Sequence, residues 1–218
     1  MEILLGIHHD HTAAVNITRT HIKAFIMDLF MAGTDTSAVG IQWAIPEVIN
    51  HPEVLKRVRK EIESVVGTSR RLVEEEDIPQ LSYLQAVVKE TLRHYPPVSV
   101  TIRESRQSCK IGGYDVPCKT TVAINLFAIM RDPQVCSEPS EFRPKRFLAS
   151  SSKREQIETN KGHGFDFISF GGGRRACPGA TFAYSMMNTT MSTLVQCFDW
   201  KVVGNGKKLR LICNQNKG

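Results

Sequence analysis

Cys177 lies in a segment whose residue types suit metal chemistry. It follows Phe170-Gly171-Gly172-Gly173-Arg174-Arg175-Ala176 and precedes Pro178 and Gly179. Glycines carry no Cβ, so the backbone of such a loop can approach a flat ligand closely and adopt left-handed turns. Pro178 suits the first turn of a helix, and a helix start favours a thiolate over a thiol. With the charge of Arg175 nearby, the segment favours an axial metal ligand beside an anionic group.

Two other interpretations of this loop stay open from the residues alone. A glycine loop ahead of a helix also binds phosphate, although the lysine of a phosphate loop is missing and no clear strand leads in. A buried structural cysteine is the second alternative. The remaining cysteines form no Cys-x-x-Cys pair and no zinc spacing; they are Cys109, Cys118, Cys136, Cys197 and Cys213. The chain shows no secretory signal, so we expect free thiols.

Length and composition predict one compact globular unit. The chain has 218 residues, of which 41% are hydrophobic and 23% charged, which excludes a disordered or fibrous protein. The net charge is +6, but no basic stretch is interleaved with aromatic residues, so nucleic acid is not a predicted partner. No stretch approaches the roughly 18 apolar residues that cross a bilayer, so we expect no membrane span.

Hydrophobic periodicity predicts a mainly α protein with small β-sheets. Helices are expected at residues 18–50, at 52–67, around 81–92 and from 178 to about 197. Short strands are expected at residues 98–103, 109–111, 114–116 and 120–124, with Gly112-Gly113 as a hairpin turn. Residues 131–170 are predicted to be a long coil, and a coil of that length is usually functional or disordered. The segment Ala32-Gly33-Thr34-Asp35-Thr36-Ser37 is expected to interrupt the first helix.

Three motifs, in this order along the chain, resemble those of the cytochrome P450 family. The residues that flank these motifs are similar to those of plant members, above all members that act on flavonoids and triterpenoids. The motifs are Ala32-Gly33-Thr34-Asp35-Thr36, similar to the oxygen-activating turn of the long central helix; Glu90-Thr91-Leu92-Arg93, similar to the Glu-x-x-Arg helix; and Phe170, Gly173, Arg175, Cys177 and Gly179, at the spacing of the haem-binding signature.

The resemblance implies that Cys177 is the axial ligand of haem b. A cysteine thiolate pushes electron density onto haem iron and favours cleavage of the O–O bond. Arg175 would then pair with one haem propionate, and Arg103 resembles a second propionate partner. For Arg103 a plain surface arginine is the alternative. Residues 98–102 would line part of a substrate pocket.

The family's oxygen-activating turn corresponds here to residues 32–36. We expect the Thr36 hydroxyl to bond the carbonyl of Ala32, which opens a helix locally, and Gly33 leaves room for dioxygen and water. Asp35 and Thr36 then resemble the acid–alcohol pair that relays protons. The alternative is a helix N-cap at Thr34 or Asp35.

The Glu-x-x-Arg resemblance implies a structural role. Glu90 and Arg93 lie three residues apart on one helical face and can pair locally. By family they join an arginine of the coil, here Arg146, to hold the haem side of the fold. Lys145 departs from the family, which usually has an acid there, and this charge reversal puts local stability in doubt.

By resemblance the chain is a haem monooxygenase that inserts one oxygen atom from O₂ into a small apolar substrate, flavonoid- or terpenoid-like. Electrons would come from NADPH through NADPH-cytochrome P450 reductase, at the cytosolic face of the endoplasmic reticulum; without an anchor, the chain expressed alone would be cytosolic. We expect residues 1–218 to form one partial domain, the C-terminal half of the fold. Residues 204–218 are not expected to supply the family's strand pair. The alternative is a truncated, non-catalytic remnant with weak or no haem binding.

Overall fold

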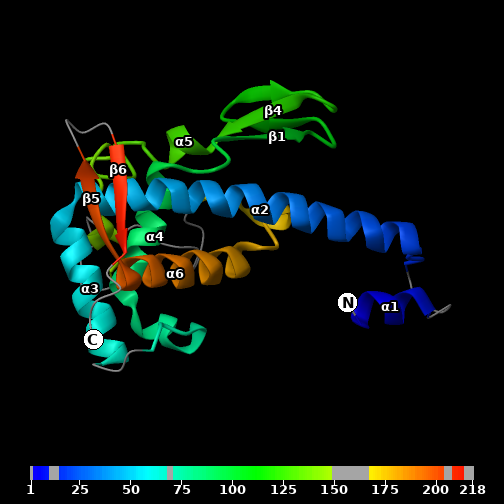
Figure 1. Cartoon of the computed structure of the whole chain (residues 1–218). Coiled ribbons are helices and arrows are strands. Elements are labelled where there is room, and N and C mark those ends of the chain that lie inside the picture. Colours follow the sequence, from blue (N-terminus) through cyan, green and yellow to red (C-terminus); the bar gives the residue numbers. More distant parts are fainter. Residues whose placement is uncertain (1, 10–14, 68–70, 149–166, 204–207, 214–218) are drawn as a thin grey trace.

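The computed structural model describes residues 2–9, 15–67, 71–148, 167–203 and 208–213. The fold is mainly helical with small antiparallel sheets, which confirms the predicted class (Figure 1). The helices are α1 (Glu2–His9), α2 (Arg19–Asn50), α3 (Pro52–Val66), α4 (Ser82–His94), α5 (Leu126–Ile129) and α6 (Ala180–Cys197). The paired strands are β1 (Val100–Glu104) with β4 (Thr121–Asn125), β2 (Cys109–Ile111) with β3 (Tyr114–Val116), and β5 (Phe198–Val203) with β6 (Lys208–Cys213). Short 3₁₀ turns cover Glu75–Gln80, Pro144–Phe147 and Gly173–Arg175.

Helix α6 is the centre of the packing. It lies along α2 and also contacts α3 and α4, while the β1–β4 pair stands apart beside the middle of α2 (Figure 1). The two long helices approach closely at Gly40, where a Cβ would lie 2.7 Å from Cε of Met187. A glycine at this position therefore lets α6 approach the pocket-lining stretch of α2.

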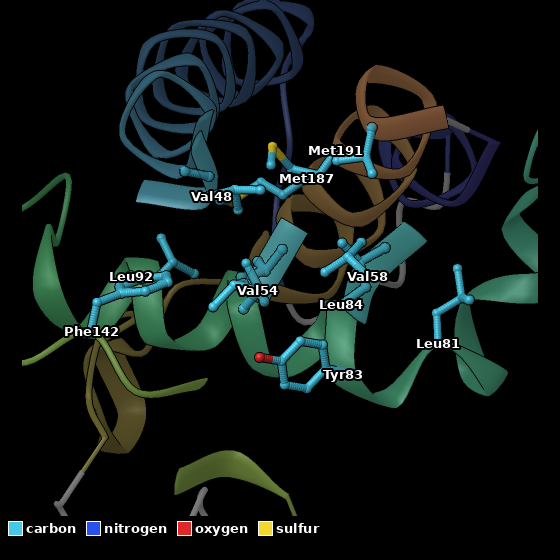
Figure 2. Packing of buried hydrophobic residues seen from close by; sticks show 14 of the residues in the cluster. Val48, Val54, Val58, Leu81, Tyr83, Leu84, Leu92, Phe142, Met187 and Met191 are labelled. Atoms are coloured by element: carbon cyan, nitrogen blue, oxygen red, sulfur yellow. The ribbon is translucent and has the colours of Figure 1, made fainter. Parts of the chain in front are cut away.

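The hydrophobic core is built from one face of each packed helix. On α3 the buried residues recur at helical spacing, as an amphipathic helix requires; they are Val54, Val58, Ile62 and Val66. Figure 2 shows Val54 and Val58 beside Leu84 and Leu92 of α4, with Met187 and Met191 of α6 on the other side. These apolar contacts fix α4 relative to α6, and both helices line the pocket described below.

Several predicted boundaries and one predicted absence were wrong. The expected interruption of the first helix at residues 32–37 does not occur, because α2 is continuous from Arg19 to Asn50 and even passes Pro46. Helix α6 begins at Ala180 and not at Pro178. The strand pair that residues 204–218 were not expected to supply is present, since β6 (Lys208–Cys213) pairs antiparallel with β5. The polar residues on both sides of this segment hid a strand that carries Leu209, Leu211 and Ile212.

Other expectations on the described residues hold. Gly112 and Gly113 form the hairpin turn with φ values of 58° and 88°, in the left-handed region that glycine tolerates. Cys109, Cys118, Cys136, Cys177 and Cys197 are free thiols. Of the predicted coil, residues 149–166 lie outside the described part of the chain.

One described helix, α2, is long and apolar enough to cross a membrane by length and composition alone. The sequence prediction of no membrane span rested on the absence of a long apolar run. The buried positions of α2 include Ser37, Gly40, Ala44 and Val48, and α2 packs against α6 and α4. A helix that packs in this way inside a protein core meets the same length and composition criteria.

Helix α4 has its N-terminal cap supplied by another helix. Its own N-cap residue, Leu81, has no side-chain hydrogen bond. Instead the carboxylate of Glu61, on α3, accepts hydrogen bonds from the backbone amides of Tyr83 at 2.7 Å and Leu84 at 2.9 Å. A negative charge at this position satisfies two open donors and complements the helix dipole.

We predict that Glu61→Ala lowers the free energy of unfolding by about 1–2 kcal/mol, because it leaves the first turn of α4 uncapped. Glu63→Ala is the matched control, since Glu63 is an exposed residue of the same helix; its effect should stay within about 0.5 kcal/mol. Urea unfolding followed by circular dichroism measures both. Equal effects of the two substitutions would contradict the capping role.

Candidate functional site

A large cavity lies between α2, α4, α6, the start of β1 and the loop before Cys177. It contains about 870 Å³ of space free of protein atoms and is partly open to solvent. Its walls are mostly apolar, and they include Leu92, Leu126 and Met187. The polar groups at the cavity are few; they include Thr36, Arg103, Ser169, Arg175 and Cys177. Large apolar walls with a few convergent polar groups are typical of a cofactor or ligand site.

The glycine loop shapes the approach to Cys177. Gly171 and Gly173 have φ values of 70° and 66°, a conformation that glycine adopts without a steric cost. The backbone amide of Cys177 donates to the carbonyl of Phe170 at 2.9 Å, which closes the loop. Gly179 is the N-cap residue of α6, so the exposed Cys177 thiol stands immediately before a helix start.

On the opposite side of the cavity lies the middle of α2. The Thr36 hydroxyl donates to the carbonyl of Ala32 at 2.6 Å, as predicted, and both residues line the cavity. Asp35 is exposed and does not line it, and Gly33 does not line it either. The N-cap alternative is wrong, because α2 begins at Arg19 with Thr18 as its N-cap.

Two arginines border the same cavity. Arg175 comes from the loop before Cys177, and Arg103 comes from β1. Nη1 of Arg103 donates to Oγ1 of Thr101 at 2.6 Å and to the carbonyl of Ile102 at 2.8 Å, so this guanidinium is held near the pocket. The structure thus brings Cys177, Arg175, Arg103, Phe170, Ala32 and Thr36 to one cavity.

Glu90, Arg93 and Arg146 form a fully buried ion network. Arg93 donates through Nε and Nη2 to the Glu90 carboxylate at 2.7 and 2.9 Å. Nε of Arg146 donates to Oε1 of Glu90 at 3.2 Å, and the backbone amide of Arg143 donates to the same oxygen at 2.8 Å. Burial opposes the charge of Arg93, but the hydrogen bond to Glu90 and the charge of that carboxylate together offset it, and the pKa of Arg93 is raised.

The remaining donors of the two arginines hold the coil. Arg93 donates to the carbonyls of Met130 and Pro139 at 3.2 and 3.0 Å. Nη2 of Arg146 donates to the carbonyl of Glu138 at 2.8 Å, and its Nη1 to that of Ser137. Backbone carbonyls therefore accept the hydrogen bonds of the Arg146 guanidinium. Arg146 keeps its partners although position 145 is a lysine and not the acid usual in the family.

His94, directly after Arg93, is a buried neighbour of the network that the sequence did not indicate. The Nε2 atom of His94 forms a hydrogen bond with the carbonyl of Ser140 at 3.1 Å. The backbone carbonyl of His94 accepts a hydrogen bond from Nη2 of Arg131 at 2.6 Å. Burial and the charges of Arg131 and Arg93 lower the pKa of His94 to about 4. This histidine is therefore neutral near pH 7.

The sequence also missed pocket residues that carry no chemical signature. Leu126, Met187 and Ser169 line the cavity, yet apolar periodicity marks the first two only as core positions. The hydroxyl of Ser169 donates to the carbonyl of Leu92 at 3.2 Å, and no sequence pattern predicts that contact. Among the described residues no group of three His, Cys, Asp or Glu side chains is placed to hold a metal ion, so Cys177 offers one ligand and no cage.

Comparisons with known proteins show which family the chain belongs to. The family model of cytochrome P450 matches residues 1–215, and the chain therefore belongs to the cytochrome P450 family. It is 48% identical over 208 residues to 3,9-dihydroxypterocarpan 6A-monooxygenase of Glycine max, covering 95% of this chain and 40% of that protein. It is 48% identical over 204 residues to cytochrome P450 705A22 of Arabidopsis thaliana, covering 94% of this chain and 39% of that protein.

Solved structures show the same fold. A zebra fish cytochrome P450 with abiraterone superposes with a TM-score of 0.79 at 28% identity, covering 93% of this chain and 47% of that one. A zebra fish cytochrome P450 with progesterone superposes with a TM-score of 0.78 at 30% identity. The match covers 91% of this chain and 43% of that one. The chain spans about two fifths of the length of the plant relatives it matches.

We predict that Glu90→Gln lowers the free energy of unfolding by about 3–5 kcal/mol, because it leaves two buried guanidinium groups without their counter-charge. Asp115→Asn is the control, since Asp115 pairs with Lys110 on an exposed hairpin at 3.5 Å and such a pair contributes about 0–1 kcal/mol. Denaturant unfolding measures both. A loss below about 1 kcal/mol for Glu90→Gln would contradict the network's role.

The lowered pKa of His94 predicts an acid-sensitive fold. Between about pH 6.5 and pH 4 the unfolded chain binds a proton at this histidine and the folded chain does not, so stability falls as the pH falls. The loss should amount to about 2–3 kcal/mol at pH 4. His94→Phe should flatten the dependence of unfolding free energy on pH across that range. An unchanged slope in the variant would contradict the assignment.

Proposed function

We propose that the protein is a haem-thiolate monooxygenase in which Cys177 is the axial ligand. One observation carries this proposal: the Cys177 thiol and the Thr36 turn of α2 line the same apolar cavity, with Arg103 and Arg175 beside it. This arrangement fits a flat, apolar cofactor that carries anionic groups. When bound, haem supplies the activation of O₂ that amino-acid side chains lack.

The chain's own residues have separate tasks toward this group. Cys177, in the loop directly before α6, would bind the haem iron through its sulfur. Arg175 and Arg103 neutralise the propionates, for which charge-assisted hydrogen bonds are strong. Phe170, which packs against Tyr184 at 5.0 Å, joins Leu92 and Met187 in excluding water from the cavity.

Thr36 and Asp35 are proposed to deliver protons to the side of the cavity opposite Cys177, where O₂ would bind. The Thr36 hydroxyl directs its hydrogen to the Ala32 carbonyl, so its oxygen can accept a hydrogen bond from water in the cavity. Asp35 is exposed and can exchange protons with solvent. Gly33 leaves the helix surface open beside them, since a Cβ at this position would meet nothing within 4 Å.

The proposed electron donor is NADPH-cytochrome P450 reductase, and the proposed location is the cytosolic face of the endoplasmic reticulum, both by family. Arg174 and Arg175 are exposed in the loop before Cys177, Lys145 is exposed on the coil, and such basic residues suit an acidic donor surface. Arg146 does not contribute to this surface, because it is buried in the network. Arg143 pairs with Glu138.

The proposed substrate is a small apolar compound of flavonoid- or terpenoid-like chemistry. The similarity to a pterocarpan monooxygenase supports this class, as do the apolar walls of the cavity. A non-catalytic chain with weak haem binding is the alternative. The observation that favours it is the N-terminal half of α2, which exposes Phe25, Phe30 and Met31, and exposed apolar patches promote association.

We predict that the ferrous–CO spectrum of the haem-loaded protein has the long-wavelength band of thiolate ligation and that Cys177→Ala abolishes it. Cys197→Ala, at the far end of α6, is the control and should retain the band. A band that persists in Cys177→Ala would refute the ligand assignment. A wild-type chain that takes up no haem would favour the non-catalytic alternative.

We predict that the substitution Thr36→Ala leaves the haem spectrum intact and diverts reducing equivalents to peroxide, because the proton relay loses its hydroxyl. The test places the substitution at the matching threonine of a full-length relative and measures product and peroxide per NADPH. Thr34→Ala is the control, since the Thr34 hydroxyl also bonds a helix carbonyl, that of Phe30 at 2.7 Å, but does not line the cavity. Unchanged product per NADPH in Thr36→Ala would exclude the relay.

A further inference from the structure

An oxidisable pair of side chains lies between the ends of α2 and α4. The indole of Trp43 stacks on the phenol ring of Tyr95 with the centroids 4.3 Å apart and the planes 5° from parallel. The Tyr95 hydroxyl donates to Oε1 of Glu47 at 2.6 Å. Neither the haem ligation nor the proton relay proposed above uses these three residues.

The Tyr95 phenol has a complete route for its proton. Glu47 is a carboxylate that is only 12% exposed, and its second oxygen lies 3.4 Å from Nδ1 of His51, whose side chain is 33% exposed. Burial and the bond to Glu47 raise the pKa of Tyr95 to about 12, so the resting phenol is protonated. Oxidation of such a phenol releases a proton, and Glu47 is placed to accept it.

Neither ring lines the cavity, but both residues are close along the chain to residues that do. Tyr95 is two residues from Pro97, which lines the cavity, so their Cα atoms are at most about 7.6 Å apart. Trp43 follows Ser37, another lining residue, by six helical positions, a rise of about 9 Å. Trp43 is 46% exposed. The pair thus connects the neighbourhood of the cavity with the surface of the described chain.

We propose that Trp43, Tyr95 and Glu47 form a proton-coupled redox relay that carries a one-electron oxidising equivalent from the cavity to the surface. An oxidant that haem and hydrogen peroxide generate in the cavity takes one electron from Tyr95, and the phenolic proton passes to Glu47. The vacancy stays on Tyr95, because a phenol that has lost its proton is easier to oxidise than an indole. A dissolved thiol at the surface returns one electron across the stacked indole of Trp43, and the proton returns from Glu47 to the phenolate oxygen. The thiol releases its own proton to water and leaves as a thiyl radical, so the net step reduces the oxidant by one electron at the expense of the thiol.

The relay rests on the proposed function for its oxidant, because a monooxygenase whose substrate is absent must dispose of oxidising equivalents. A purely structural latch between α2 and α4 is the competing explanation of the same contacts. The two differ in what conservative substitutions change. A latch affects only stability, whereas a relay affects radical transfer.

The first test needs no haem. The chain has two tryptophans, so Trp200→Phe leaves Trp43 as the only one, and azide radicals generated by pulse radiolysis then oxidise its indole. We expect the tryptophan radical to convert into a tyrosyl radical at a rate independent of protein concentration. Tyr95→Phe should abolish this conversion, and Glu47→Gln, which keeps a hydrogen-bond acceptor but removes the base, should slow it on the order of 100-fold.

Tyr114→Phe is the matched control, because Tyr114 is 79% exposed on the β2–β3 hairpin; it should leave the conversion unchanged. Thermal unfolding by circular dichroism confirms that each variant is folded. A conversion rate unchanged by both Tyr95→Phe and Glu47→Gln overturns the relay and leaves the latch.

The second test uses the haem-loaded protein with hydrogen peroxide and no substrate. Peptide mass spectrometry should locate oxidation products at Trp43 and Tyr95, added glutathione should suppress them, and Tyr95→Phe should bleach haem faster. Bleaching at an unchanged rate, with no modification of either residue, overturns the connection to the cavity. Failure to bind haem overturns the proposed function and this connection together, while the radiolysis result still decides whether the pair is coupled.

Discussion

The buried carboxylate of Glu90 is the interaction on which the rest of the structure depends. It is inaccessible to solvent and lies between the guanidinium groups of Arg93 and Arg146, with the backbone amide of Arg143 as a further donor. Burying one carboxylate with two guanidinium groups carries a large desolvation cost, and only a full set of partners offsets it. The carbonyls of residues 130–141 supply those partners. The coil therefore has one arrangement that satisfies the charges.

This arrangement positions the cavity. Helix α4 carries the network on one side and contributes Leu92 to the cavity, and the carbonyl of Leu92 accepts from Ser169 in the segment before the glycine loop. The loop then closes through the bond between the Cys177 amide and the Phe170 carbonyl. A rigid α4 thus holds the loop, and the loop holds the thiol toward α2. The network acts on the site through backbone position and not through contact with any ligand.

The sequence predicted those parts of the site that depend on local rules. The bond from Thr36 to the Ala32 carbonyl and the pairing of Glu90 with Arg93 follow from spacings of four and three residues on a helix. The left-handed glycines before Cys177 follow from residue type. The expected break in α2 was wrong, because packing against α6 keeps the helix continuous despite the side-chain bond to its backbone.

Long-range contacts were beyond such rules. The cap on α4 comes from Glu61 on another helix, and His94 is buried by segments more than thirty residues away in sequence. The β5–β6 pair was missed because residues 204–218 are polar and basic as a whole, although Lys208-Leu209-Arg210-Leu211 alternates between polar and apolar types. The resemblance supplied the role of Arg146, which no local pattern indicates.

Native-state hydrogen exchange tests the central claim most directly. If the Glu90 network joins α4 to the coil, the protected amides of α4 and those of Cys136, Glu141 and Arg146 should exchange through one opening reaction. They should then share one free energy and one dependence on denaturant. Exchange of the coil amides through a separate opening of much lower free energy, with α4 still protected, would contradict the account.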